Sequence, residues 1–252
     1  MTPIVIIPAL LAAQRLPGKP LADIGGVPMI VRAMRIAQAA GVGPVAVAAG
    51  DAEIVDVVRA AGGDAVLTDP DLPSGSDRIM AALSMLDVHG QHDTVINLQG
   101  DMPFCSPRVL QACEHLLRGE SSCDIATVVA PEASLADRSN PDVVKAIVTM
   151  TPGRPGGRAL YFTRSTLYGD APVWRHVGVY GYRREALERF TSAPPSPLEK
   201  REKLEQLRAM ELGLSIWASV VDEAPLSVDT TADLDAARAW AATLAGGRSA
   251  AP

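Results

Sequence analysis

Two cations stand in a short loop that follows the first apolar run of the chain. The run covers residues 3–9 and leads to a tight turn at Pro17 and Gly18, with Arg15 before the turn and Lys19 after it. Fixed cations in such a loop could hold the negative charge that develops on a pyrophosphate leaving group. The loop matches neither the glycine fingerprint of dinucleotide-binding proteins nor the Walker P-loop. Taken alone, such a short motif is more often an ordinary surface loop that carries two solvated cations.

Two aspartates also follow apolar runs. Asp101 comes soon after residues 94–98, and Asp229 follows the last apolar run through a short turn. If both lie at the carboxyl edge of one sheet, they form a two-carboxylate site for Mg²⁺, which prefers hard oxygen ligands. The competing role for an aspartate after a strand is a helix N-cap, and we favour that role for Asp51.

Neutral polar side chains accompany these charges. Gln99 and Ser74 could bind a neutral part of a ligand by hydrogen bonds, because such a part needs donors and acceptors rather than charges. A buried glutamine at a strand end could instead satisfy backbone groups. The sequence contains neither a G-x-S-x-G motif nor a cysteine–histidine pattern, so we expect no covalent nucleophile.

The elements that must position these residues alternate between strand and helix patterns in the first half. Strands alternating with helices indicate βαβ units, a mostly parallel sheet and right-handed crossovers. Ligands of such sheets bind beyond the carboxyl ends of the strands. The expected strands are residues 3–9, 44–49, 64–68 and 94–98, and the expected helices are residues 28–40, 51–61 and 76–86.

The second half is less regular and richer in strands. Together with the first half, it predicts one α/β domain, Rossmann-like and doubly wound, with a smaller β-rich lobe. We expect the domain to cover residues 1–245, with a first half to about residue 130, and a frayed tail at 246–252. The expected strands are residues 125–130, 143–150, 158–163, 176–182 and 215–221, with a loop at 151–157 and helices at 198–212 and 231–244.

Composition limits the class of protein. With 48% apolar and 21% charged residues, the chain can bury an ample core. A net charge of −6 argues against a general nucleic-acid binder but permits a local cationic pocket. Three cysteines without C-x-x-C spacing indicate a reducing compartment. The apolar N-terminal stretch is too short to span a bilayer, so we expect a soluble cytoplasmic protein with no nucleic-acid or membrane partner.

The motifs taken together resemble those of the 3-deoxy-manno-octulosonate cytidylyltransferases. These enzymes join the eight-carbon acid sugar Kdo to CMP, using CTP and releasing pyrophosphate. The similar segments run in order from about residue 4 to about residue 240. They are R-L-P-G-K-P-L at 15–21, S-G-S-D-R at 74–78, N-L-Q-G-D at 97–101, N-P-D-V-V-K at 140–145, A-L-Y-F-T-R at 159–164, H-V-G-V-Y-G-Y-R at 176–183, P-S-P-L-E at 195–199, L-E-Q-L-R at 204–208 and V-D-T at 228–230.

The resemblance implies a nucleotide-diphospho-sugar transferase fold and transfer of CMP from CTP to the anomeric hydroxyl of Kdo. It also implies Mg²⁺ as cofactor, a homodimer with a contact near residues 160–200, and a role in lipopolysaccharide precursor synthesis. The sugar-binding and dimerisation part would then be residues 131–245. The implied catalytic residues are Lys19, Arg15 and Asp101, and the implied metal ligands are Asp101 and Asp229. The implied nucleotide-binding residues are Ala9, Arg15, Lys19, Ser74, Arg78, Gln99 and Gly100, and the implied sugar-binding residues are Arg164, His176, Tyr180, Glu205 and Gln206.

The chain departs from the family pattern at three places. The family's I-P-A-R ends here in Leu10, its A-T-D reads Ala48-Ala49-Gly50 with Asp51 one position later, and Met102 stands where many members carry glutamate. Because the cations, the aspartates and the sugar segments are kept, we expect a working enzyme. The alternatives are a cytidylyltransferase for a different acid sugar and an impaired paralogue that binds nucleotide or sugar without turnover. A generic nucleotide-binding domain fits less well, since the motifs of the second half are intact.

Overall fold

The computed structural model describes residues 1–12, 15–150 and 153–247. It divides into two compact units whose segments are interleaved along the chain. The first, which we call the parallel unit, comprises Val5–Val88, Leu98–Pro107 and the segment from Pro225 onward. The second, the mixed unit, comprises Met1–Ile4, His89–Asn97 and Arg108–Ala224. The predicted extent of the domain, residues 1–245 with a division near 130, stays a prediction.

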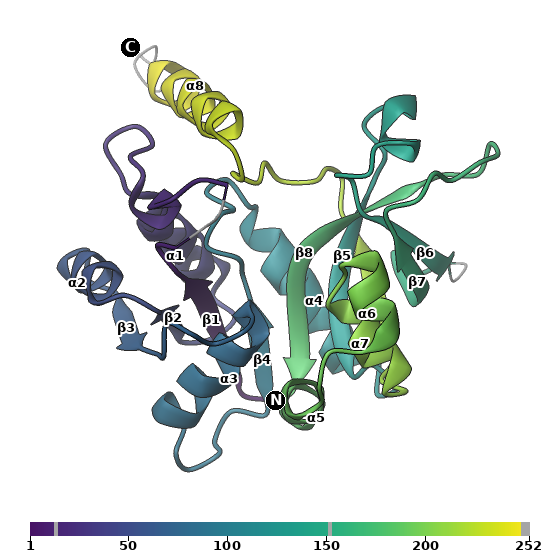
Figure 1. The fold of residues 1–252 in the computed structure, drawn as a ribbon, viewed down its shortest axis with the longest axis horizontal. Helices are drawn as coiled ribbons and strands as arrows, with labels where there is room; N and C mark the ends of the chain where they lie inside the picture. Colours follow the sequence, from purple (N-terminus) through teal and green to yellow (C-terminus); the bar gives the residue numbers. More distant parts are fainter. Residues whose placement is uncertain (13–14, 151–152, 248–252) are drawn as a thin grey trace. The chain divides into compact units, whose positions relative to one another are not determined.

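The parallel unit is built on three parallel strands (Figure 1). They are β1 (Pro3–Ala9), β2 (Val45–Ala49) and β3 (Asp64–Leu67), in the order β3-β2-β1. The helices of this unit are α1 (Met29–Ala40), α2 (Ala52–Ala60) and α3 (Gly75–Leu86), with a 3₁₀ turn at Lys19–Leu21. Residues 4–9 of β1 are buried without interruption, as expected for a strand that is covered on both faces.

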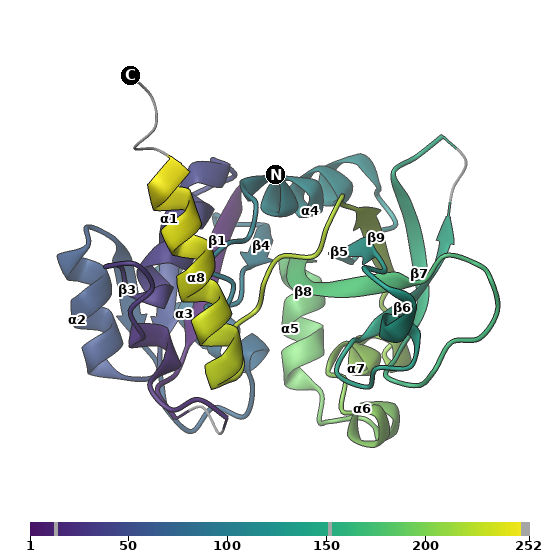
Figure 2. The ribbon, with the colours of Figure 1, turned by 90° about the horizontal axis from the view of Figure 1, so that it is seen from above.

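A last helix, α8 (Thr231–Gly247, yellow in Figure 2), completes the parallel unit. Its apolar residues Leu234 and Ala237 join a buried cluster with Ile24, Met29 and Val228. This packing ties the segment that carries Asp229 to the start of α1, although about 200 residues separate them in sequence.

The mixed unit holds strands in the order β4-β8-β5-β9-β7-β6, of which β5 and β9 are parallel and the other pairs antiparallel. The predicted α/β fold with a β-rich part is therefore confirmed. The strands are β4 (Thr94–Asn97), β5 (Ile125–Pro131), β6 (Lys145–Met150), β7 (Gly156–Thr163), β8 (Trp174–Arg183) and β9 (Ile216–Val220). The helices are α4 (Pro107–Gly119), α5 (Arg184–Ser192), α6 (Pro197–Glu202) and α7 (Gln206–Glu211), with a 3₁₀ turn at Leu135–Arg138.

Several element predictions need correction. The single helix expected at 198–212 is wrong, because Lys203 adopts a left-handed backbone (φ 56°) that ends α6 before α7 begins. The strand expected from residue 143 begins at Lys145, and the loop expected to reach residue 157 ends earlier, since β7 starts at Gly156. Residues 151–152 and most of the expected tail lie outside the described residues.

Within the described ranges, no helix combines the length and the apolar character needed to cross a membrane. The three cysteines lie buried as thiols. Burial raises the pKa of Cys105 and of Cys123 to about 12, so neither is a reactive thiolate near neutral pH.

Candidate functional site

A cavity of about 310 Å³ opens at the carboxyl end of β1 in the parallel unit. It brings together six of the seven residues predicted to bind nucleotide; the seventh, Arg15, is not among the lining residues. The lining comes from four parts of the chain: residues 8–10, residues 19–20, residues 72–75 with Arg78, and residues 99–101.

Charged groups converge at the rim of this cavity. Nζ of Lys19 donates to Oδ2 of Asp101 at 2.8 Å and to Oδ1 of Asp229 at 3.0 Å. Nη2 of Arg15 lies 3.1 Å from Oδ2 of Asp229. The Lys19 side chain is only 17% exposed, whereas that of Arg15 is 64% exposed. Lys19 is therefore held between the two carboxylates, and Arg15 approaches them from the solvent side.

The protonation state of Lys19 follows from these contacts. Burial opposes the charged amine, but the ion pairs and hydrogen bonds with Asp101 and Asp229 outweigh that effect and raise the pKa of Lys19 above 10.5. Lys19 is thus a permanent cation at neutral pH.

Backbone contacts fix the distance between the two carboxylates. The N–H of Val228 donates to the carbonyl of Asp101 at 2.9 Å, which places the residue before Asp229 beside Asp101. The carboxylate of Asp233, in the first turn of α8, accepts hydrogen bonds from the N–H groups of Asp229 and Thr230. The docking of α8 therefore determines where Asp229 lies.

The two carboxylates suit a hard cation. Both place an oxygen within 3.0 Å of the Lys19 ammonium nitrogen, so they face a common point, and in this structure the ammonium group of Lys19 holds that point. No cluster of three or more His, Cys, Asp or Glu side chains suited to a metal occurs among the described residues. A pair of carboxylates fits Mg²⁺, which usually takes one or two protein carboxylates and completes its shell with water and phosphate oxygens.

Small residues let backbone approach the cavity. A Cβ atom on Gly100 would lie 3.0 Å from the carbonyl oxygen of Pro8, so a larger residue would push the end of β1 aside.

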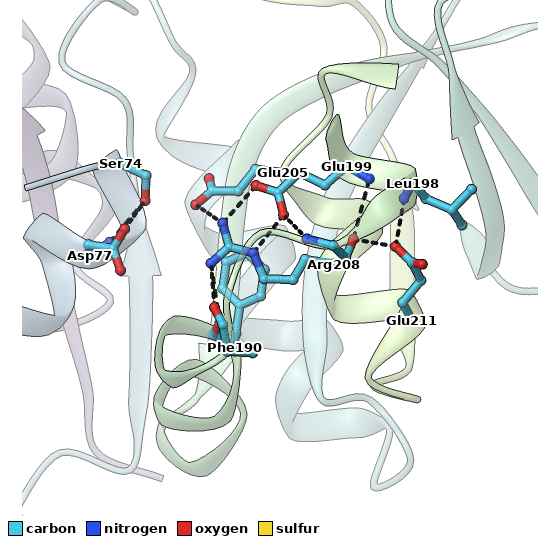
Figure 3. A network of polar contacts seen from close by, with 10 residues as sticks. Ser74, Asp77, Phe190, Leu198, Glu199, Glu205, Arg208 and Glu211 are labelled. Carbon is cyan, nitrogen blue, oxygen red and sulfur yellow. Dashed lines mark hydrogen bonds and ion pairs between the residues drawn. The ribbon is translucent and has the colours of Figure 1, made fainter. Parts of the chain in front are cut away.

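Ser74 caps α3: its hydroxyl accepts from the N–H of Asp77 at 3.2 Å and donates to Oδ2 of Asp77 at 2.7 Å (Figure 3). Any contact from Ser74 to a base or ribose would have to share a hydroxyl that already serves the helix.

Arg78 is buried and already bonded to the protein. Nη1 donates to Oγ1 of Thr68 at 2.7 Å and to the carbonyl of Asp69 at 2.9 Å, and Nη2 donates to the carbonyl of Pro70 at 3.1 Å. Burial lowers the pKa of Arg78, and the charges of Asp51 and Asp69 oppose that shift. The guanidinium thus also holds the β3–α3 connection that lines the cavity.

The capping role expected of Asp51 is wrong in part. Within the described chain, Asp51 stands at the N-cap position of α2, yet its side chain makes no capping hydrogen bond. Its Oδ2 instead accepts the N–H of Leu11 at 2.8 Å, in the loop after β1. The backbone N–H of Leu11 therefore donates to the Asp51 carboxylate, which would otherwise accept hydrogen bonds from the first turn of α2.

Three of the predicted sugar residues meet in the mixed unit. Tyr180, Glu205 and Gln206 line a cavity of about 10 Å³ beside Tyr182 and Phe190. This space is the size of one water molecule, so it would have to widen to admit a sugar. A row of rings continues along β8, because Tyr180 stacks on Tyr182 with ring centroids 5.7 Å apart.

His176 and Arg164 are not among the residues that line this small cavity. The His176 ring lies 5.3 Å from the Tyr180 ring, and Nε2 of His176 lies 3.0 Å from Oγ1 of Thr127. Desolvation lowers the pKa of His176 to about 3, so the imidazole is neutral at physiological pH. Nη1 of Arg164 donates to the carbonyl of Pro141 at 2.9 Å. The sugar-binding roles of all five residues stay predictions.

Sequence reasoning missed the ion pair that supports α7. Arg208 donates from Nε and Nη2 to the two carboxylate oxygens of Glu199, each at 2.7 Å (Figure 3). Its guanidinium also lies 4.9 Å from the centre of the Phe190 ring. Burial alone would raise the pKa of Glu199, but the hydrogen bonds from Arg208 and Ser196 lower it. Glu199 lies in the matched motif at 195–199 and Arg208 in the one at 204–208, but the number of residues between them does not predict that they form an ion pair.

Apolar lining residues were also missed. Leu72 and Pro73 line the cavity at the end of β1, directly before the S-G-S-D-R motif, and Pro20, which also lines it, follows Lys19. Their position beside recognised motifs was the signal in the sequence that could have identified them.

A second cavity of about 600 Å³, in the mixed unit, is lined by α4, residues 154–157, Trp217 and Ser219 and contains none of the predicted site residues.

Comparisons with known proteins agree over nearly the whole chain. A family model described as cytidylyltransferase matches residues 4–216. A 3-deoxy-manno-octulosonate cytidylyltransferase of Rhodospirillum centenum is 52% identical over 251 residues, which cover 99% of this chain and 97% of the relative. The protein of the same name from Parvibaculum lavamentivorans is 56% identical over 239 residues, covering 94% of this chain and 92% of the relative.

Solved structures extend the comparison to the fold. A CMP:2-keto-3-deoxy-manno-octonic acid synthetase, solved in complex with CTP, is similar with a TM-score of 0.89 and 36% identity, and the match covers 97% of this chain and 100% of that chain. A 4-diphosphocytidyl-2C-methyl-D-erythritol synthase from Anaerococcus prevotii is similar with a TM-score of 0.64 at 12% identity, over 95% of this chain and 97% of that chain. The second likeness concerns the fold alone.

Proposed function

We propose, since this chain belongs to the 3-deoxy-manno-octulosonate cytidylyltransferase family, that it transfers CMP from CTP to the anomeric hydroxyl of 3-deoxy-D-manno-octulosonate. The observation that carries this proposal is the convergence of Lys19, Asp101 and Asp229 at the rim of a cavity lined by the matched nucleotide motifs. A nucleotide with its phosphates at that rim would meet a fixed cation and two carboxylates at the same point.

The transfer requires positioning more than covalent chemistry. The hydroxyl oxygen of the acid sugar attacks the α-phosphorus, the hydroxyl proton is lost, and the bond from the α-phosphorus to the oxygen bridging to the β-phosphorus breaks, so that pyrophosphate leaves. In this proposal Lys19 and Arg15 hold the charge that grows on the leaving group, which their positions beside Asp101 and Asp229 support. Fixed cations stabilise such a transition state without rearranging during the step.

Asp101 and Asp229 would hold Mg²⁺. When bound, this ion supplies positive charge to phosphate oxygens and a template that orients them. The two aspartates themselves keep Lys19 oriented and charged, which their hydrogen bonds to its ammonium group support.

The acid sugar would bind to the mixed unit. The side chains of Tyr180, Glu205 and Gln206 lie together there, and the neutral His176 stands next to Tyr180. Hydroxyl, carboxylate, amide and imidazole groups can bind the many hydroxyls of a polyol. Arg164 supplies a cation for the sugar carboxylate in this proposal.

A substrate panel tests the proposal. The purified protein with Mg²⁺ is given CTP, UTP or ATP together with Kdo, and CTP together with a nine-carbon acid sugar. We expect CMP-Kdo as the product, with CTP and Kdo giving the highest kcat/KM. A higher kcat/KM for the nine-carbon sugar would assign the chain to a different acid sugar, and CTP binding without any sugar nucleotide would indicate an impaired paralogue.

The wider setting follows from the family. We propose that the chain acts in the cytoplasm as a homodimer and provides an activated sugar for lipopolysaccharide precursors. Light scattering on the purified protein tests the assembly: a mass twice that of the chain supports a dimer, and a monomer at the concentration used in assays contradicts it.

A further inference from the structure

The hydroxyl of Thr127 lies where the pairing of β5 with β8 shifts its register. The two strands lie side by side in the mixed unit (Figure 1), and Thr127 pairs with Tyr180 of β8. The next residue, Val128, pairs with Val177, so β8 carries extra residues at this point. Thr127 is fully buried, and its Oγ1 lies 2.8 Å from the carbonyl oxygen of Val179 and 3.3 Å from that of Val177. The side chain therefore bonds to the main chain of β8 where the strand pairing is interrupted.

A count of hydrogens gives the direction of a second contact of Thr127. Its Oγ1 also lies 3.0 Å from Nε2 of His176. A threonine hydroxyl has one hydrogen, and a carbonyl oxygen can only accept. If that hydrogen pointed at Nε2, the hydroxyl oxygen and the Val179 carbonyl oxygen would face each other at 2.8 Å without a hydrogen between them, at a buried position. The hydroxyl therefore donates to Val179, and Nε2 of His176 carries a hydrogen that it donates to Thr127.

This contact selects one tautomer of His176. Desolvation lowers the pKa of His176 to about 3, so the imidazole is neutral near pH 7 and has a single N–H. Because Nε2 holds that hydrogen, Nδ1 is an unprotonated acceptor. Within the described ranges Nδ1 makes no hydrogen bond, and His176 is partly exposed, so a ligand can reach it. The rings of Phe162 and Tyr180, with centroids 5.0 Å and 5.3 Å from that of the imidazole, hold its plane.

We propose that Thr127 is a positioning residue that fixes His176 as the Nε2–H tautomer, and that Nδ1 of His176 accepts a hydrogen bond from a hydroxyl of the acid sugar. The contact with the sugar rests on the proposed function, whereas the choice of tautomer does not. An unprotonated nitrogen attracts a hydroxyl and repels a carboxylate. His176 thus binds the polyol part of the substrate and leaves the carboxylate to a cation such as Arg164. A site built in this way discriminates against a sugar that lacks the hydroxyl it binds.

Nitrogen NMR tests the tautomer without ligand or turnover. The protein is labelled with ¹⁵N-histidine, and the signals of His176 are identified by their loss in His176→Asn. The two nitrogens of a neutral imidazole differ in chemical shift according to which of them carries the hydrogen. We expect a protonated Nε2 and an unprotonated Nδ1 in the wild type near pH 7. A wild type with the hydrogen on Nδ1 would overturn the assignment.

Substitutions of Thr127 test whether its hydroxyl fixes the tautomer. Thr127→Val keeps the shape of the side chain but removes the acceptor, so His176 should become a mixture of tautomers. The KM for Kdo should rise about five- to tenfold, while the KM for CTP stays within about twofold of the wild-type value. Thr127→Ser keeps the hydroxyl and should retain the Nε2–H tautomer and most of the sugar affinity. Thr149→Val, an exposed change on β6, is the control.

Two results with these variants would overturn the positioning role. One is a Thr127→Val protein with the wild-type His176 spectrum and a KM for Kdo equal to that of the control. The other is a Thr127→Ser protein that loses the Nε2–H tautomer, which decides the matter even if Thr127→Val does not fold.

The contact with the sugar has a readout of its own. Kdo is added to the labelled wild type together with CTP and without Mg²⁺, and CTP alone is the comparison. A hydroxyl that donates to Nδ1 should shift the Nδ1 resonance, whereas CTP alone should leave it in place. A protein that turns over Kdo but shows no shift of Nδ1 would overturn the sugar contact. A shift without any turnover would support the contact and count against the proposed function alone.

Discussion

At the scale of single residues, Lys19 is the cation that pairs with both carboxylates of the site. Its ammonium group contacts both Asp101 and Asp229, so its removal would leave two carboxylates close together without a cation. We predict that Lys19→Met lowers kcat for pyrophosphate release by about 10² to 10³, the effect typical of a lost group that stabilises the transition state. Steady-state kinetics measure the loss, with Lys200→Met, an exposed change on α6, as the control.

The ion pairs of Lys19 with Asp101 and Asp229 depend on pH in a predictable direction. Because the ion pairs raise the pKa of Lys19 above 10.5, the pairs are fully formed below that pH and are lost only as the pH rises through the higher folded-state value. A decline in kcat centred near pH 8 that disappears in Lys19→Arg would contradict the assignment of Lys19 as a permanent cation.

At the scale of elements, the Glu199–Arg208 ion pair joins α6 to α7. Contacts in the folded protein depress the pKa of Glu199 below 4.5, so its contribution to stability is present above pH 4.5 and is lost as the pH falls through the depressed value. We predict that Glu199→Gln lowers the free energy of unfolding by about 1.5–3 kcal/mol at pH 7, with a smaller difference from wild type at acidic pH.

Urea unfolding at several pH values measures this effect. Glu188→Gln removes an exposed ion pair with Arg184 on α5 and should cost less than about 1 kcal/mol. A cost for Glu199→Gln that is the same at pH 7 and pH 3 would show that the carboxylate charge is not what joins the two helices.

The packing of α4 on the mixed sheet depends on Gly181. A Cβ atom at this position in β8 would lie 2.8 Å from Cδ1 of Leu117, 3.0 Å from Cδ1 of Ile96 and 3.3 Å from Cβ of Cys113. We predict that Gly181→Ala destabilises the protein by about 1–3 kcal/mol through overpacking. Gly119→Ala is the matched control, since a Cβ there meets nothing within 4 Å. Equal thermal midpoints for the two variants would contradict the close approach of α4.

The same elements indicate what a sequence can predict. Periodicity and apolar runs located β1 and α1 to within a residue, because burial alone determines those patterns. The break at Lys203 was missed, since a left-handed lysine has no signature in composition. The contact of Asp51 with Leu11 was missed for a different reason: it depends on tertiary placement, whereas an N-cap prediction uses local spacing.

The site was predictable to a similar degree. Motif order predicted six residues that the structure brings together in one cavity, and the structure also brings Asp101 and Asp229 to one ammonium group; the ligand of the cavity stays a prediction. The apolar Leu72 and Pro73 carried no chemical signal of their own. A Cβ atom on Gly50 would overlap the side chain of Leu10, and this close contact could not be predicted because the two residues are forty positions apart in the sequence.

At the scale of the whole molecule, each of the two compact units contains residues that are predicted to bind one of the two substrates. The nucleotide cavity is lined by the parallel unit, and Tyr180, Glu205 and Gln206 belong to the mixed unit. We predict that CTP slows amide hydrogen exchange at residues 74–78 and 98–101, and that the acid sugar slows exchange in β8 and α7. Hydrogen-exchange mass spectrometry with each ligand alone checks this. Protection by CTP confined to β8 and α7 would contradict the assignment of the nucleotide to the parallel unit.

We propose that the charged cluster at the cavity rim catalyses cytidylyl transfer, and the rate of pyrophosphate release is the first quantity to measure. The wild type, Asp101→Asn and the exposed control Asp235→Asn on α8 are assayed with CTP, Kdo and Mg²⁺. We predict saturable turnover in the wild type and the control, and a loss of about 10²-fold or more in Asp101→Asn. Absence of turnover in the wild type, or an Asp101→Asn rate equal to that of the control, would contradict this catalytic role of the cluster.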